Sequence, residues 1–374
     1  MREHKQQLDT LRFLAFAGVF LFHADDRAFP YGAMGVPLFF VLSGFLITRL
    51  LVINEGPSLG ASLSAFYARR TLRIFPLYYA VLCVLLLVGK LPHAGWYFAY
   101  LHNVYVFHEH AWTGNTHHFW SLCVEEQFYL LFPLLLLATR PRWRFLLLAG
   151  CVVGSVAARV GLYLAYPEAY SFALLPVAGE YLAWGCLAGL YEVAARDRRL
   201  PARALVAVGV LVAGVTAALH FGLAFPNVAA GQTVYPSFHA VGFALIVLGA
   251  WRLEAGWLLA ALSVRPVVYL GRISYGLYVY HNFCYGVKGR LVGWIPSLEP
   301  IPGPAFALIA TVGLAVLSWH LFEYPINRLK SRFPYPKAAG SAPEQAADDE
   351  QPAHEEAGQR RQEPVGERAG TGLA

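Results

Sequence analysis

Two ionisable side chains, Arg12 and His23, lie near opposite ends of the first long apolar run, LDTLRFLAFAGVFLFH. Such groups are costly inside a membrane-length segment, and they usually face a protein interior or a water-filled cavity. At a helical rise of about 1.5 Å per residue, their spacing corresponds to about 16 Å along the axis. A lone histidine is more often a satisfied core residue, but an imidazole also titrates in the range that suits proton transfer. The pair therefore indicates chemistry rather than a simple anchor.

A second cluster, FYARRTLRIFPLYY, places Arg70 and Arg73 three residues apart, on one face of a predicted helix. One interpretation is a topological signal whose side chains extend to lipid headgroups. The other is a clamp for a cytosolic polyanion, because arginine forks match phosphate oxygens in a bidentate manner.

A third feature is the stretch HHFWSLCVEEQFYLLFP, residues 117–133. If this span runs from outside to inside, Glu125 lies about one turn below the outer boundary, at the depth expected for His23. A carboxylate that orients a histidine tautomer recurs in acyl transfer, so we predict an acid–base pair. Glu126 points elsewhere on the helix and is interpreted as an interfacial charge.

Several other motifs are absent or weak. The sequence contains no Walker loop, HExxH or GxGxxG pattern. Ser43 in VLSGF is interpreted as a small residue that lets helices approach closely. The predicted outer segment is rich in histidine, but no carboxylate or cysteine accompanies these residues at fixed spacing, so no metal site is expected. They are His102, His108, His110, His117 and His118.

The elements that must position these residues are membrane helices. The chain is 57% hydrophobic and only 14% charged, well below the charged share of soluble domains. A span needs about 20 mostly apolar residues, and this criterion predicts an all-α membrane protein with about ten spans. They are 8–27, 34–53, 75–91, 120–138, 143–165, 171–192, 203–223, 235–251, 268–288 and 303–323.

The charge pattern predicts that both termini are cytoplasmic. Arginines concentrate in alternate loops, whereas the segments 91–119 and 221–234 contain no lysine or arginine, as the positive-inside rule requires of outer loops. Residues 1–335 are expected to form the membrane domain. The segment 336–374 is polar and contains no aromatic residue, so a disordered cytoplasmic tail is expected there. No nucleic-acid motif is present, and no nucleic-acid partner is expected.

Taken together, six stretches resemble the integral-membrane acyltransferase family three, which includes O-antigen acetylases. They are LDTLRFLAFAGVFLFH, GVPLFFVLSGFLIT, FYARRTLRIFPLYY, HFWSLCVEEQFYLLFP, LGRISYGLYVYH and FEYPINR. The resemblance covers about residues 8–332, and the six in this order are specific although each alone is weak. Some members carry a fused extracytoplasmic SGNH-type domain; none is seen in this sequence, which implies that the membrane core performs the transfer alone.

The resemblance implies roles for particular residues. Arg12 and His23 correspond to the arginine–histidine pair of the first span, Arg70 and Arg73 to the family's arginine pair, and Glu125 to the glutamate of the SLxVExQF stretch. These are the expected catalytic residues (His23, Glu125, Arg12) and donor-binding residues (Arg70, Arg73). Four further residues are expected to bind the acceptor: His118, Tyr275, His281 and Asn103.

The implied activity is transfer of an acyl group, with acetyl the expected case, from cytosolic acyl-CoA to a hydroxyl. The acceptor would be a glycan, a lipid-linked sugar or a secondary metabolite, and the location a bacterial cytoplasmic membrane. His23 would act as general base, with an acyl-imidazole on the same ring as an alternative. A proton-coupled secondary transporter is the rival class, because buried His, Arg and Glu also mark proton pathways. Against it, no repeated half with matching interrupted spans is evident.

Overall fold

The computed structural model describes residues 5–196, 198, 200–221 and 228–336, and these contain helices and turns but no strand. The predicted all-α class is therefore confirmed for this part of the chain. Apart from Pro336, the predicted tail lies outside the described residues. The α-helices are α1 (Gln6–Ala24), α2 (Gly35–Ile53), α3 (Leu59–Leu87), α4 (Ala94–Phe98), α5 (His102–Glu109), α6 (Phe119–Ala138), α7 (Arg144–Ala165), α8 (Leu175–Ala194), α9 (Ala202–Phe221), α10 (Val228–Thr233), α11 (Tyr235–Arg252), α12 (Trp257–Ala261), α13 (Arg265–Arg272), α14 (Ser274–Cys284), α15 (Val287–Leu291), α16 (Gly303–Ser318) and α17 (Tyr324–Asn327).

Within the described residues, six helical segments are long and apolar enough to cross a membrane. They are Pro30–Ile53, Leu59–Leu87, Gly114–Ala138, Pro141–Ala165, Ala202–Phe221 and Gly303–Arg332. In two of them, the segments containing α7 and α9, only 17% of the apolar window is buried inside the protein. Large side chains such as Leu146 and Leu211 are exposed there, and extended exposed apolar surface of this kind marks contact with lipid. The chain is therefore a multi-pass membrane protein.

The four other predicted spans also coincide with helices, namely α1, α8, α11 and the pair α13–α14. These helices carry more polar residues, for example Asp9 and Arg12 in α1 and Glu180 in α8. The count of ten spans and the cytoplasmic location of both termini stay predictions. The end of the predicted span 203–223 lies outside the described residues.

Two helix boundaries differ from the sequence prediction. Helix α3 begins at Leu59 instead of residue 75, and Ser58 caps it by accepting a hydrogen bond from the Ala61 N–H at 3.3 Å. The arginines of this region lower the local hydropathy, but they do not interrupt the helical hydrogen bonds. The predicted span 268–288 is divided at Ile273 into α13 and α14.

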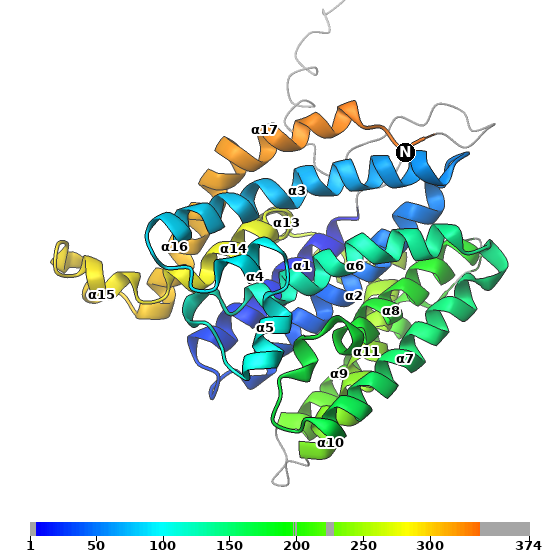
Figure 1. Cartoon of the computed structure of the whole chain (residues 1–374), viewed down its shortest axis with the longest axis horizontal. Coiled ribbons are helices and arrows are strands. Elements are labelled where there is room, and N and C mark those ends of the chain that lie inside the picture. The colour runs from blue at the N-terminus through cyan, green and yellow to red at the C-terminus, as the bar shows by residue number, and fades with distance from the viewer. Residues whose placement is uncertain (1–4, 197, 199, 222–227, 337–374) are drawn as a thin grey trace, which may run out of the picture. The chain divides into compact units, whose positions relative to one another are not determined.

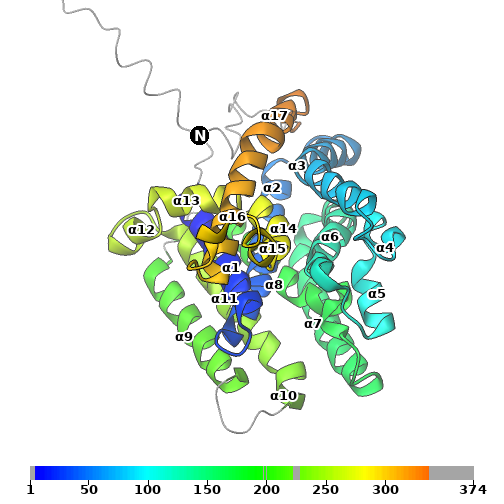
Figure 2. The same cartoon turned by 90° about the vertical axis from the view of Figure 1, so that its left-hand side faces the viewer.

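Helices α1 and α2 lie at the centre of the bundle (Figure 1). Helix α2 contacts α1, α6, α8 and α11, and α1 also contacts α13 and α14. Helices α7 and α9 lie at opposite edges (Figure 2), each packed on an inner neighbour, α8 and α11 respectively. The first two helices, which carry His23 and Ser43, are thus surrounded by the helices that bring the remaining candidate residues.

The crossing of α2 and α8 depends on glycine. A Cβ atom at Gly44 would lie 2.1 Å from the Leu182 carbonyl oxygen, and one at Gly185 would lie 2.1 Å from the Val41 carbonyl oxygen. Both distances are far below van der Waals contact, so only glycine allows these backbones to approach so closely. This contact fixes the helix that carries Ser43.

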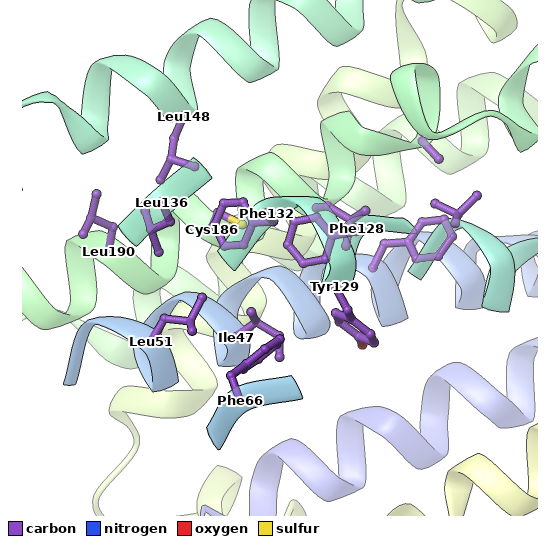
Figure 3. Packing of buried hydrophobic residues seen from close by; sticks show 14 of the residues in the cluster. Ile47, Leu51, Phe66, Phe128, Tyr129, Phe132, Leu136, Leu148, Cys186 and Leu190 are labelled. Atoms are coloured by element: carbon purple, nitrogen blue, oxygen red, sulfur yellow. The ribbon is translucent and has the colours of Figure 1, made fainter. Parts of the chain in front are cut away.

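One apolar cluster joins α2, α3, α6, α7 and α8 (Figure 3). Ile47 of α2, Phe66 of α3 and Leu136 of α6 are fully buried in it. Because interiors of this kind are close-packed, the cluster holds the three helices in a fixed relation. The same helices carry Ser43, Arg70 and Glu125, whose positions therefore depend on this packing.

Candidate active site

Four histidine rings gather near the end of α1, where His23 occupies the last turn. His23 Nδ1 lies 2.8 Å from His281 Nε2, and His23 Nε2 lies 3.2 Å from His117 Nε2. The ring centroids of His118 and His281 are 4.9 Å apart. The structure thus brings together three residues predicted separately, His23, His118 and His281, and it adds His117.

Main-chain carbonyl groups determine which nitrogens of two neutral rings carry hydrogen, because a carbonyl oxygen can only accept. His281 Nδ1 lies 2.6 Å from Tyr278 O and therefore donates, which leaves His281 Nε2 as an acceptor. His117 Nδ1 donates to Gly114 O at 2.7 Å in the same way. His23 must then donate from Nδ1 to His281. Its Nε2 lone pair is left directed at the His117 ring and available to take up a proton.

His118 and Asn282 support this arrangement from one side. Both residues are buried, and His118 Nε2 donates to Val279 O at 3.2 Å. Asn282 Nδ2 lies 3.2 Å from His118 Nδ1 and 3.3 Å from His117 Nε2. With both ring nitrogens of His118 engaged by the protein, its side chain holds neighbouring groups in place.

A pair of hydroxyl groups extends from the histidines along α6. Ser121 Oγ and Tyr278 Oη share a hydrogen bond of 2.6 Å, and both oxygens lie within hydrogen-bonding distance of the His118 carbonyl oxygen, at 3.1 and 3.2 Å. Ser121 and Tyr278 line a small cavity that also reaches Glu125. The histidine cluster and Glu125 are therefore connected through the walls of one cavity.

Glu125 lies one helical turn beyond Ser121 on the same face of α6. Ser43 Oγ donates to Glu125 Oε1 at 2.6 Å, and the Tyr129 hydroxyl donates to Ser43 Oγ at 3.1 Å. Within the described part of the chain, no hydrogen bond joins Glu125 to His23. The contact expected from this glutamate, which would orient His23, is instead made by His281.

Arginines approach Glu125 from the side away from the histidines. The Arg70 guanidinium lies 5.1 Å from the Tyr129 ring centroid, one turn beyond Glu125 on α6. Arg70, Arg12 and Arg73 are all near enough for their charges to act on the Glu125 carboxyl group. Arg70 therefore approaches α6 at Tyr129, one turn beyond Glu125 and away from Ser121.

Arg12 is held by an acidic neighbour. Its Nη1 atom donates to Asp9 Oδ1 at 3.0 Å, and Asp9 Oδ2 lies 3.6 Å from Arg272 Nε of α13. Helix α13 reaches this point because Gly271 has no side chain, since a Cβ atom there would lie 1.9 Å from the Asp9 carbonyl oxygen. The close packing of α13 on α1 therefore positions both arginines around a buried aspartate.

Two other predicted residues make contacts inside the protein. The Tyr275 hydroxyl donates to Ile74 O at 2.8 Å, and its side chain lines the same cavity as Glu125. Asn103 of α5 is buried, and it exchanges hydrogen bonds of 2.8 and 3.2 Å with Gln127. Their roles in acceptor binding stay predictions. Among the described residues, no group of three or more His, Cys, Asp or Glu side chains could hold a metal ion.

Sequence reasoning missed several members of the site. Ser43 was expected only to let helices pack closely. In the structure it lies on the face of α2 that meets Glu125 and donates a hydrogen bond to its carboxylate. His117 was one of many histidines in a segment, and only its adjacency to His118 and the WSL stretch could have distinguished it. Three more residues stand within motifs that were recognised, but their contacts were not predictable: Ser121, Tyr278 and Asn282.

Comparison with known proteins agrees with the family resemblance found in the sequence. A family described as an acyltransferase domain matches residues 5–320. The chain is 26% identical to the O-acetyltransferase OatA of Staphylococcus aureus, over 86% of this chain and 57% of that protein. It is 25% identical to the peptidoglycan O-acetyltransferase OatA of Listeria monocytogenes, over 87% of this chain and 56% of that protein. The chain thus spans little more than half the length of these relatives, and no solved structure matches it.

Proposed function

Because the chain belongs to the family-three membrane acyltransferases, we propose that it transfers an acetyl group from cytosolic acetyl-CoA to a hydroxyl group of an acceptor on the other side of a bacterial cytoplasmic membrane. Family membership decides in favour of an enzyme over the transporter that the sequence alone left as a rival. Acetyl is the proposed group because both relatives are named O-acetyltransferases. The peptidoglycan named for the Listeria protein makes a cell-envelope glycan the first acceptor to test.

The donor would bind at the arginine end of the site. Acetyl-CoA carries several phosphate charges, and Arg70 and Arg73 offer guanidinium groups that can pair with phosphate oxygens in a bidentate manner. Glu125 lies within the electrostatic reach of both arginines and of Arg12. We assign this carboxyl group a positioning role on the donor side, where it organises the arginines and borders the cavity.

The observation that carries the proposal is that His23 Nε2 carries a lone pair, because the ring hydrogen is on Nδ1 and is donated to His281. His281 fixes the tautomer of this ring from the opposite nitrogen, at 2.8 Å, as the orienting carboxylate does in hydrolytic triads. When His23 Nε2 takes up a proton, the resulting N–H can donate to His117 Nε2, which is 3.2 Å away. This distance supports the proposal, because a hydrogen bond to His117 would stabilise the charged form of His23.

The reaction balances without a further reagent. The acceptor oxygen attacks the thioester carbonyl carbon while His23 Nε2 removes the hydroxyl proton. Collapse of the tetrahedral intermediate breaks the carbon–sulfur bond, and the proton held by His23 leaves with the thiolate as CoA thiol. A general base of this kind contributes about 10²- to 10⁴-fold to the rate. The alternative, in which His23 Nε2 itself attacks and briefly carries the acetyl group, uses the same lone pair.

Purified protein in lipid nanodiscs provides the test. Acetyl-CoA binding is measured by calorimetry, and turnover is measured as CoA released from acetyl-CoA in the presence of acceptor-containing membranes. His23→Ala should bind acetyl-CoA like the wild type but release CoA at least about 100-fold more slowly. Wild-type turnover by His23→Ala would refute the assignment. Acid quenching with radiolabelled acetyl-CoA separates the two routes, because only the acyl-imidazole route labels the protein.

A further inference from the structure

A small cavity lies between α2, α6 and α14, with Glu125, Ser121 and Tyr278 among its lining residues. Its walls include Val36 and Phe39 of α2, Leu122 and Glu125 of α6, and Tyr278 of α14. Most of the lining is apolar, and the polar groups are concentrated on α6 and α14. None of the roles assigned above explains why an apolar space should exist at this position.

The size of the cavity is informative. Its volume is about 50 Å³, and one water-sized group needs about 10–15 Å³ by this measure, so it has room for about three to five such groups. An acetyl group has three non-hydrogen atoms, and a butyryl group adds two methylenes. Because methyl and methylene groups are larger than a water molecule, the cavity matches the three non-hydrogen atoms of an acetyl group and lacks room for all five of a butyryl group.

The location also fits an acyl group. Glu125, at one end of the cavity, is close enough to Arg70 and Arg73 for their charges to act on its carboxyl group. At the other end, the Tyr278 hydroxyl lies within hydrogen-bonding distance of the carbonyl oxygen of His118, and the Tyr278 carbonyl holds His281, the partner of His23. The cavity thus lies between the carboxyl group nearest the proposed donor site and the tyrosine that holds His281.

We propose that this cavity holds the acyl group of the donor, and that Phe39 and Val36 limit that group to two carbons. The proposal rests on the acyl-CoA donor described above, and it adds the substrate class of that site. Phe39 is the limiting wall because its ring packs edge-on against Tyr278, with a centroid distance of 5.9 Å. Val36, one turn earlier on α2, borders the same space.

Binding of CoA, acetyl-CoA and butyryl-CoA to the protein in nanodiscs tests this assignment. The wild type should bind butyryl-CoA at least about tenfold more weakly than acetyl-CoA. In Phe39→Ala the difference should fall below about threefold, because the enlarged cavity can bury both additional methylenes. Val36→Phe fills the cavity, so its affinity for acetyl-CoA should fall to that for CoA.

CoA provides the internal control, since it has no acyl group and its affinity should be the same in every variant. Leu38→Ala is the matched control, because Leu38 is a partly buried residue of the same helix that packs into a different cluster. If Phe39→Ala binds CoA normally but keeps the wild-type preference for acetyl-CoA, the cavity assignment is overturned while the proposed function stands. If the wild type binds none of the three compounds, the donor proposal itself fails.

Discussion

Replacement of His281 by leucine tests whether this ring controls the tautomer of His23. The two nitrogens are 2.8 Å apart, and His281 is fully buried, so water cannot replace the lost acceptor. His23 becomes positively charged as it takes the proton, and a hydrogen bond to a charged group contributes about 1.5–3 kcal/mol. Since about 1.4 kcal/mol corresponds to a tenfold change in rate, His281→Leu should lower kcat about 10- to 100-fold.

The assay is the release of CoA from acetyl-CoA in nanodiscs supplied with acceptor-containing membranes. The KM for acetyl-CoA should not change, because the arginine end of the site is untouched. His281→Gln is the matched variant, because its amide oxygen can accept from His23 Nδ1 and should retain most of the rate. The reasoning is refuted if His281→Leu turns over at the wild-type rate, or if His281→Gln is impaired as strongly as His281→Leu.

Three other predictions follow from the contacts around the site. Arg70→Ala should weaken acetyl-CoA binding about 10- to 100-fold in calorimetry, because a charge-assisted phosphate contact is lost. Arg142 is exposed, and Arg142→Ala should bind acetyl-CoA like the wild type. Equal effects in the two variants would contradict the proposed arginine clamp. Ser43→Ala should leave Glu125 without its 2.6 Å donor and destabilise the protein by about 1–3 kcal/mol, measured by thermal denaturation, and Ser43→Thr, which keeps the hydroxyl, should be less affected. Burial, with a smaller effect of the His117 charge, lowers the pKa of His102 in α5 from its usual 6.5 to about 3. The unfolded chain therefore binds a proton below about pH 6.5 that the folded chain refuses, and stability should fall by about 2 kcal/mol between pH 6.5 and pH 5. In a denaturation series, His102→Phe should reduce the loss of stability over this pH range by about 2 kcal/mol and leave the part due to other groups, and an unchanged slope would show that His102 does not contribute.

The fold was largely predictable because membrane helices depend on long apolar runs. Predicted starts for α2 and α6 lie within one residue of the observed helices. The start of α3 was missed because hydropathy detects only the length of the apolar run. The helix begins where its hydrogen bonds begin, at the Ser58 cap. The break between α13 and α14 was also missed; it lies two residues after Gly271, where α13 packs closely on α1.

The sequence named some residues of the candidate site, but it did not predict their contacts. Motif positions identified His23 and His281, yet these residues are separated by 258 positions, and nothing in the sequence indicates that their rings meet. Depth along the helices suggested Glu125 as the partner of His23, but depth does not specify which face of a helix points inward. Ser43 illustrates the same limit, because a serine that allows close packing and one that donates to a carboxylate look alike in sequence.

The most direct test of the central claim is made in cells. A deletion strain of the source bacterium is complemented with the wild-type chain or with His23→Ala, and acetyl groups on envelope glycans and small metabolites are measured by mass spectrometry. We predict that the wild type restores an acetyl mass missing from the deletion strain, and that His23→Ala, present in the membrane at the same level, does not. Full restoration by His23→Ala would contradict the account, because the proton-accepting nitrogen would then be elsewhere.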